Sequence, residues 1–318
     1  MLSVAKVQKR NAWRYYVRGV AFGDGRRPAR QPMKDAEREL LDDGVVSETA
    51  RPATVLGQPI EEIEARKQTP LLALDLVLRP QASLNVLWAL GDGRTRRVIE
   101  RAHERAIATV LRWLEDEVAQ TRWSSGRWRE RAPALVVAKW RHFDNRDGCP
   151  LLHDHCLIAN RVQRPDGSWY ALDTVRLLQH VVAAGTLYTL TMTTEVCEKL
   201  GLATVPREVT PGLRPVMEIA GVDRELIDWS STRRKQIDPV LERVTDQYVR
   251  DHGGLPDERA RHGLGWWAAQ DTRRQKKTPK SHTEAIASWE FRQSISSSLE
   301  RSKERIHDPR GWLCRFAF

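Results

Sequence analysis

Two short apolar runs separated by a turn constrain the fold of this chain most strongly. The runs span residues 134–143 (ALVVAKWRHF) and 152–160 (LHDHCLIAN), and Gly148 and Pro150 lie between them. Apolar runs of this length, bounded by glycine and proline, are typical of β-strands joined by a turn. A third short element over residues 161–170 follows directly, so the sequence predicts a three-element antiparallel meander.

The rest of the chain predicts one further strand and several helices. Residues 71–78 (LLALDLVL) form a continuous apolar run, which predicts a buried strand. Apolar residues at helical spacing predict two helices, over residues 91–120 and 173–200, and two further helices are expected over about 223–250 and 256–272. Strands, a long helix, more strands and then helices favour an α+β fold, with a central antiparallel sheet flanked by helices, over alternating βαβ units.

The charge of the chain favours an anionic partner. Its 318 residues carry a formal net charge of +10, and the isoelectric point is about 9.7. Such a surplus points most often to nucleic acid, and the indole faces of the 12 tryptophans suit stacking on unpaired bases. Most tryptophans in proteins are packing residues, so their number alone is weak support.

Several classes of protein are disfavoured by what the sequence lacks. No run approaches the roughly 20 apolar residues of a membrane span, and the N-terminus has no apolar signal region. We therefore expect a cytoplasmic protein without a membrane partner. The four cysteines form no C-x-x-C pair, which favours free thiols. No G-x-x-x-x-G-K-[ST] phosphate loop occurs, so we expect no ATP-dependent activity.

Three histidines around the predicted turn form a candidate metal site. His153 and His155 are two residues apart and share one face of a strand, and His142 ends the preceding strand. A loop of ten residues between His142 and His153 would bring the three imidazoles together. Neutral imidazoles suit Zn, Mn, Ni, Co or Cu, whereas Mg prefers oxygen ligands. A polar sheet face with hydrogen-bonded histidines is the alternative interpretation.

The string WRHFDNRDGCPLLHDHCLIAN resembles the three-histidine signature of the TrwC/MobF-type conjugative relaxases, which are HUH endonucleases. That signature has the form F-R-H-x-x-S/N-R-x-x-x-P-x-L-H-x-H-x-x-x-x-N. The matching positions are His142, Arg146, Pro150, Leu152, His153, His155 and Asn160. Residues 74–92, residues 164–173 and the Tyr15-Tyr16 pair are similar to other segments of the family, so the resemblance covers roughly residues 1–275.

The resemblance implies a fold and a domain organisation. It implies an α+β relaxase domain with a Rep-like palm, made of a catalytic sheet over about 1–200 and a helical region over about 201–275. Residues 276–318 are basic and show no domain-scale apolar pattern, so we expect a weakly ordered tail there. Large relaxases continue into a helicase, and the missing phosphate loop indicates that this chain contains the relaxase domain only.

The resemblance also implies a reaction. Relaxases cut one DNA strand at an origin of transfer, where a tyrosine attacks the scissile phosphate and becomes a 5′-phosphotyrosine. By analogy Tyr15 is the nucleophile, Tyr16 is its neighbour, and the three histidines bind one divalent ion, either Mn, Mg, Zn or Ni. Asp75 matches the acid that orients a ligand histidine or receives the tyrosyl proton. An aspartate in an apolar run is costly to bury unless it is paired, which marks Asp75 independently.

The implied partner is single-stranded or hairpin DNA at an origin of transfer, together with relaxosome or coupling proteins. Candidate phosphate contacts are Arg14, Arg26, Arg27, Arg79 and Arg146. The chain departs from many family members at Ala21-Phe22, where a second tyrosine pair would lie. Two alternatives therefore stay open: a truncated, catalytically impaired relaxase that acts as a DNA-binding module, and an unrelated three-histidine metallohydrolase.

Overall fold

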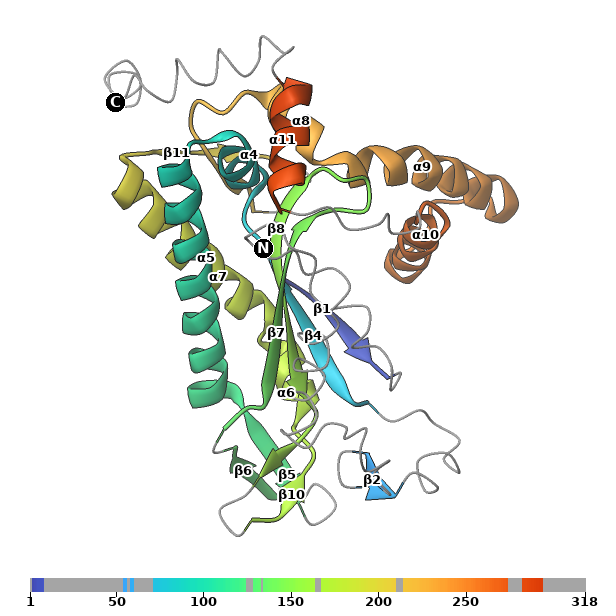
Figure 1. Ribbon diagram of the computed structural model, residues 1–318. Helices are drawn as coiled ribbons and strands as arrows, with labels where there is room; N and C mark the ends of the chain where they lie inside the picture. The colour runs from blue at the N-terminus through green and yellow to red at the C-terminus, as the bar shows by residue number, and fades with distance from the viewer. Residues whose placement is uncertain are drawn as a thin grey trace, which may run out of the picture.

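The computed structural model of the protein describes residues 2–8, 54–55, 58–59, 71–123, 128–132, 134–163, 167–209, 214–273 and 282–293. Its centre is a four-stranded antiparallel sheet in the order β1-β4-β8-β7 (Figure 1). These strands are β1 (Leu2–Val7), β4 (Ala73–Leu78), β7 (Val137–Asp144) and β8 (Pro150–Ala159). The predicted α+β fold with a central antiparallel sheet is confirmed.

The predicted meander is wrong at its third element. β9 (Val162–Gln163) and β10 (Trp169–Tyr170) form a separate two-stranded sheet. The edge of β8 that a third strand would need is already paired with β4. At the end of β8, the backbone N–H of Asn160 donates to the carbonyl of Leu72, and its side chain donates to the carbonyl of Leu71. These bonds tie the chain to the start of β4, so it leaves the sheet at this point.

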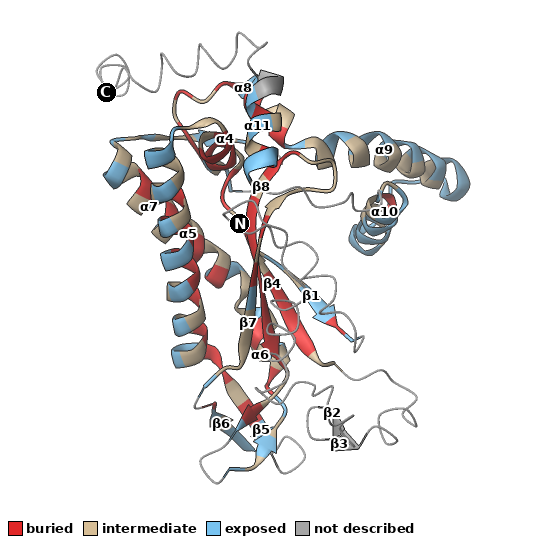
Figure 2. Cartoon of the chain, in the orientation of Figure 1, coloured by how far each residue is buried: buried red, intermediate tan, exposed pale blue. Residues whose placement is uncertain are grey.

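One face of the sheet carries the hydrophobic core. Alternate residues of β4 and β8 are buried on this face, namely Leu74, Leu76, Leu78, Leu152, Cys156 and Ile158. Two long helices cover it, α5 (Gly93–Trp113) and α7 (Val181–Leu200) (Figures 1 and 2). α5 continues into a π-helical turn, η1 (Leu114–Val118), so the helix predicted over 91–120 is confirmed.

The helix predicted over residues 173–200 is interrupted. α6 (Thr174–Gln179) ends at His180, and α7 begins directly after it. α7 ends at Gly201, whose φ of 65° lies in the left-handed region that favours glycine. The helix predicted over residues 223–250 is divided in the same way, at Ser231, into α8 (Arg224–Ser230) and α9 (Thr232–His252).

The remaining elements lie at the two ends of the sheet (Figure 1). They are β2 (Thr54–Val55), β3 (Gln58–Pro59), α4 (Ala82–Leu90), β5 (Gln120–Trp123), β6 (Trp128–Arg131), β11 (Thr204–Arg207), β12 (Val216–Ile219) and α10 (Glu258–Asp271). α9 and α10 pack on each other and project away from the sheet, and α9 buries none of its residues. Within the described ranges, every helix is too short or too polar to cross a membrane.

The expected weakly ordered tail begins with a packed helix. α11 (His282–Gln293) lies against α4, and the indole of Trp289 is 1 % exposed. That indole lies 5.5 Å from the ring of Trp88 and donates to the carbonyl of Gly148, at 2.8 Å. Residues 282–293 are therefore part of the packed structure, and the partners of Trp289 are too distant in sequence for periodicity to indicate them.

Candidate metal centre

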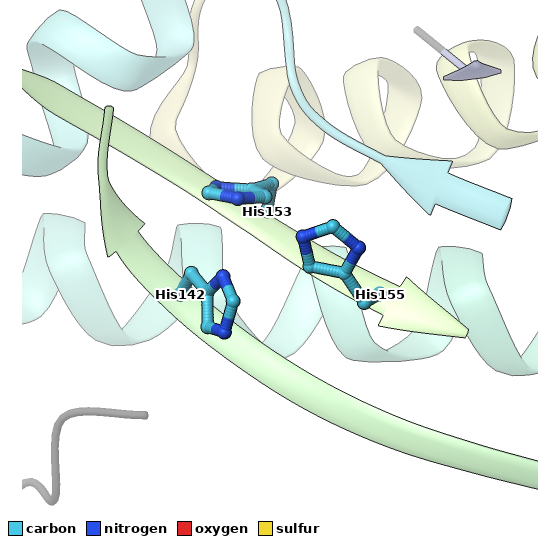
Figure 3. A group of neighbouring side chains, drawn as sticks. All are labelled: His142, His153 and His155. Carbon is cyan, nitrogen blue, oxygen red and sulfur yellow. The ribbon is translucent and has the colours of Figure 1, made fainter. Parts of the chain in front are cut away.

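The β7–β8 hairpin brings the three predicted histidines together. His142 of β7 and His153 of β8 are directly opposite each other, and His155 follows two residues later on the same face (Figure 3). The ring centroids are 5.1 Å apart for His142–His153, 4.8 Å for His142–His155 and 5.3 Å for His153–His155. All three residues are buried, and one nitrogen of each lies within 4.8 Å of the others.

The connection between the histidines is tighter than the predicted ten-residue loop. β7 continues to Asp144 and β8 begins at Pro150, so much of the supposed loop is paired strand. The side-chain oxygen of Asn145 closes the turn by accepting from the backbone N–H groups of Asp147 and Cys149. Gly148 has a φ of 76°, a conformation that residues with a Cβ rarely adopt. Two paired strands therefore fix where the imidazoles point.

Hydrogen bonds determine which nitrogen of two of the rings carries the proton. His153 Nδ1 lies 2.8 Å from the carbonyl of Leu151, which only accepts, so this nitrogen carries the proton. His155 Nδ1 lies 2.8 and 3.0 Å from the two carboxylate oxygens of Asp75 and donates in the same way. In both rings Nε2 is left with its lone pair, as a metal ligand requires.

The charge state of the site also fits a metal ion. Burial, and after it the proximity of His142, lowers the pKa of His153 well below its usual range. The ring is therefore neutral at physiological pH, and a neutral imidazole is the form that binds divalent ions. Among the described residues, these three histidines are the one group of His, Cys, Asp or Glu side chains arranged for a metal. Three nitrogen ligands leave coordination positions for water or an oxyanion.

The structure describes three of the other predicted site residues, and the rest lie outside the described ranges. Asp75 is 4 % exposed and its carboxylate faces His155, so the structure brings it to the site. Arg79 follows β4, and its positive charge contributes to the lowered pKa of His153. Arg146 lies in the β7–β8 turn, within electrostatic range of Arg233 on α9. The remaining predicted residues lie outside the described ranges, namely Tyr15, Tyr16, Arg14, Arg26 and Arg27.

A buried polar group on the opposite face of β8 was not predicted. Asp154 lies between the two ligand histidines in sequence, but it points into the core and is fully buried. Its carboxylate accepts from His103 of α5 at 3.0 Å and from Arg141 of β7 at 2.9 Å. Burial alone would raise the pKa of Asp154, but these two partners outweigh it and hold the pKa well below its usual range. Tyr188 of α7 lies 2.6 Å from the other nitrogen of His103.

The sequence did carry a signal for this group. His103 falls on the apolar stripe of α5 beside Ile99, Ala102, Ala106 and Ile107, so helical spacing places it inside the protein. Two polar residues at core positions of separate elements require each other as partners.

A second unpredicted residue supports the start of β8. β4 ends at Leu78, which pairs with Asp154, so β8 has no neighbouring residue of β4 beyond that point. The side-chain oxygen of Asn85 on α4 accepts there from the backbone N–H of Leu152, at 2.7 Å. The amide nitrogen of Asn85 in turn donates to the carbonyls of Pro80 and Gln81. Directly before His153, the buried side chain of Asn85 thus provides the hydrogen-bond acceptor that a neighbouring strand would otherwise provide.

Comparison with known proteins identifies the family. The family model of the TrwC relaxase matches residues 4–294. A metal-bound structure of the conjugative relaxase TrwC with oriT DNA is similar at 22% identity and a TM-score of 0.66, covering 96% of this chain and 98% of that one. A copper-bound structure of that relaxase with oriT DNA is similar at 23% identity and a TM-score of 0.67, covering 92% and 98%.

A third solved structure, TrwC complexed with a 27-mer DNA comprising the recognition hairpin and the cleavage site, is similar at 21% identity and a TM-score of 0.62. It covers 92% of this chain and 98% of that one. At these identities the structures show a shared fold. No curated protein sequence matches the chain. The family model spans nearly the whole sequence, and the chain therefore belongs to the TrwC relaxase family.

Proposed function

We propose that this protein is a DNA-nicking relaxase, which cleaves one strand at an origin of transfer by metal-assisted transesterification. The observation that carries the proposal is the group of three buried histidines on the β7–β8 hairpin of a TrwC relaxase-family chain. The structural neighbours were solved with oriT DNA, and two of them are described as metal-bound or copper-bound. A relaxase acts on DNA inside the cell, so a cytoplasmic location is part of the proposal.

The reaction exchanges one phosphodiester for another. The phenolic oxygen of Tyr15 attacks the scissile phosphorus and forms a P–O bond, and the bond from phosphorus to the 3′ oxygen breaks. The net result transfers the phenolic proton to the 3′ oxygen, which leaves as a hydroxyl. A phenol with a pKa near 10 needs activation to react at neutral pH. A divalent ion held by His142, His153 and His155 would supply positive charge beside the non-bridging phosphate oxygens. Tyr16, the neighbouring tyrosine, is the alternative nucleophile.

Asp75 is proposed to orient His155 and not to receive the tyrosyl proton. Both of its oxygens lie within 3.0 Å of His155 Nδ1, and the residue is 4 % exposed. A carboxylate that is engaged in this way fixes the tautomer and the direction of a ligand ring.

The DNA strand is proposed to follow the positive charge near the site. Arg79 lies within electrostatic range of His153, and Arg146 lies within electrostatic range of Arg233 on α9. We therefore propose that Arg79 contacts the scissile phosphate or its neighbour and that Arg146 extends the path along the β7–β8 turn. Arg14, Arg26 and Arg27 remain candidate contacts, and relaxosome and coupling proteins remain candidate partners. We propose that a single relaxase domain extends through residue 293, because α11 packs on α4.

The test is capture of the covalent adduct. The substrate is a pool of single-stranded oligonucleotides, each with an inverted repeat followed by a randomised segment and a 3′ label. With Mn²⁺, we expect an SDS-resistant protein–DNA band that requires metal and is lost in Tyr15→Phe, with Tyr16→Phe as the matched control. Salt-sensitive binding without any adduct would support the DNA-binding module instead. Absence of both binding and adduct would favour a metallohydrolase acting on another substrate.

A further inference from the structure

Asp154 is an ionised side chain in the apolar layer of the sheet. On β8 it alternates with Leu152 and Cys156, and its neighbour across the sheet on β4 is Leu78. All three of these neighbours are fully buried apolar or thiol side chains, and Asp154 itself has no exposed surface. A buried carboxylate has a large desolvation cost unless partners compensate it. Asp154 is therefore stable at this buried position only while its hydrogen-bond partners are in place.

Its direct partners come from β7 and α5, and a third element, α7, is reached through the partner on α5. Arg141 of β7 donates from Nε to Oδ1 at 2.9 Å and from a terminal nitrogen to Oδ2 at 3.2 Å. His103 of α5 lies 3.0 Å from Oδ1, and Tyr188 of α7 lies 2.6 Å from the second nitrogen of that ring. Because the ionised carboxylate only accepts, His103 donates from Nε2 and accepts from the Tyr188 hydroxyl at Nδ1. Asp154 thus joins β8 directly to β7 and α5 and, through His103, to α7.

The partner on β7 lies next to the metal centre. Arg141 is opposite Asp154 in the strand register, and the adjacent cross-strand pair is His142 with His153. Side chains alternate between the two faces of a strand, so a shift of one residue would turn His153 and His155 into the core. The same shift would move Asp154 away from Arg141 and His103, which leaves a buried carboxylate unpaired. A register shift is therefore energetically unfavourable in the β8 segment that carries His153 and His155.

We infer that Asp154 is a positioning residue of the metal centre, which holds β8 in register with β7 and against α5 so that the three imidazoles meet at one point. The inference rests on the proposed metal-dependent function. It assigns the middle residue of the His-Asp-His segment a role on the face of the sheet opposite the ligands. A purely stabilising role would leave the affinity and geometry of the metal site unchanged in any variant that folds.

The test uses the purified full chain and Co²⁺ alone, whose visible spectrum reports the number and arrangement of ligands. Asp154→Asn keeps the shape of the side chain and removes its charge, and Arg141→Lys removes the two-point contact at a partly exposed position. We expect both variants to bind Co²⁺ about 10-fold more weakly than the unmodified protein, with altered absorption bands. Thermal unfolding, measured in parallel, shows that each variant is folded.

Glu218→Gln is the matched control. Glu218 is also a buried carboxylate, is 2 % exposed, and accepts from Arg207 and from the backbone N–H and hydroxyl of Ser83. It lies on β12, outside the hairpin, so Glu218→Gln is expected to lower stability without changing Co²⁺ binding.

Unchanged affinity and spectra in folded Asp154→Asn and Arg141→Lys would overturn the inference, and so would an equal loss in Glu218→Gln. If Asp154→Asn does not fold, Arg141→Lys decides the question alone. Failure of the unmodified protein to bind Co²⁺ through its histidines, judged against His153→Ala, would overturn the proposed metal site and the inference with it. Normal binding by the unmodified protein and by Asp154→Asn would overturn the inference alone.

Discussion

Replacement of Trp289 by alanine should destabilise the protein substantially, although the residue lies near the end of the described chain. The indole is 1 % exposed, packs against Trp88 at 5.5 Å, and donates to the carbonyl of Gly148 at 2.8 Å. Trp88 stacks in turn on Phe143 of β7, with ring centroids 5.7 Å apart. Removal of a buried tryptophan costs about 3–5 kcal/mol, as a result of lost burial and of the cavity left behind.

The measurement is the free energy of unfolding from urea titration followed by circular dichroism. Trp289→Phe separates the two contributions, because it keeps most of the aromatic packing and loses the N–H donor. We expect a loss of about 1–2 kcal/mol for that variant, of which about 1 kcal/mol is the hydrogen bond to Gly148. Trp266→Ala on α10 is the control, since that indole is 67 % exposed and should change stability by less than about 0.5 kcal/mol.

A loss of less than about 1 kcal/mol in Trp289→Ala would refute this reasoning, because such a value is typical of surface positions. It would mean that α11 does not pack on α4 in solution, and that the domain ends earlier. A loss in the expected range, accompanied by weaker metal binding, would show that α11 also supports the β7–β8 turn through Gly148.

Three further predictions concern the site and its surroundings. Asp75→Asn should weaken divalent metal binding about 10- to 100-fold in a chelator competition assay, because the amide no longer fixes the tautomer of His155; unchanged affinity would show that this ring is oriented by other contacts. Cys156 is buried, which raises the pKa of its thiol, so mass spectrometry should find it unalkylated by iodoacetamide in the folded protein and alkylated after unfolding. Burial lowers the pKa of His103 below its ordinary value of 6.5, against the opposing effect of Asp154. The unfolded chain then takes up the proton first, so stability should fall as the pH drops through about 6.5, and His103→Gln should reduce that slope in urea titrations.

The sequence predicted the parts of the fold that are encoded by local pattern. The apolar runs predicted three of the four strands of the central sheet, helical spacing predicted α5 and α7, and helices were also expected at the positions of α9 and α10. The His-x-His spacing placed two imidazoles on one face, and strand pairing brought the third to them. These features depend on periods of two and 3.6 residues, which are visible in any short window of sequence.

Features that depend on pairing across long distances were not predicted. The third element of the meander failed because β4 occupies the edge of β8, and strand order is set by contacts between segments far apart in the chain. α11 was missed for the same reason, since the carbonyl that Trp289 contacts belongs to the β7–β8 turn. Neither contact leaves a periodic trace in the sequence near the residues involved.

The network behind the metal centre lies between these two cases. Asp154 occupies a core position in the alternation of β8, and His103 occupies a core position on the stripe of α5. Each residue alone contradicts the pattern of its element, and a buried charge without a partner would cost more than a small domain can tolerate. When two polar residues occupy core positions of elements that pack on each other, the most favourable arrangement is a hydrogen bond between them. The same reasoning identified Asp75 on the ligand face of the sheet. Applied to both faces of β8, it would have predicted from the sequence that the His-Asp-His segment is held from the side opposite to its ligands.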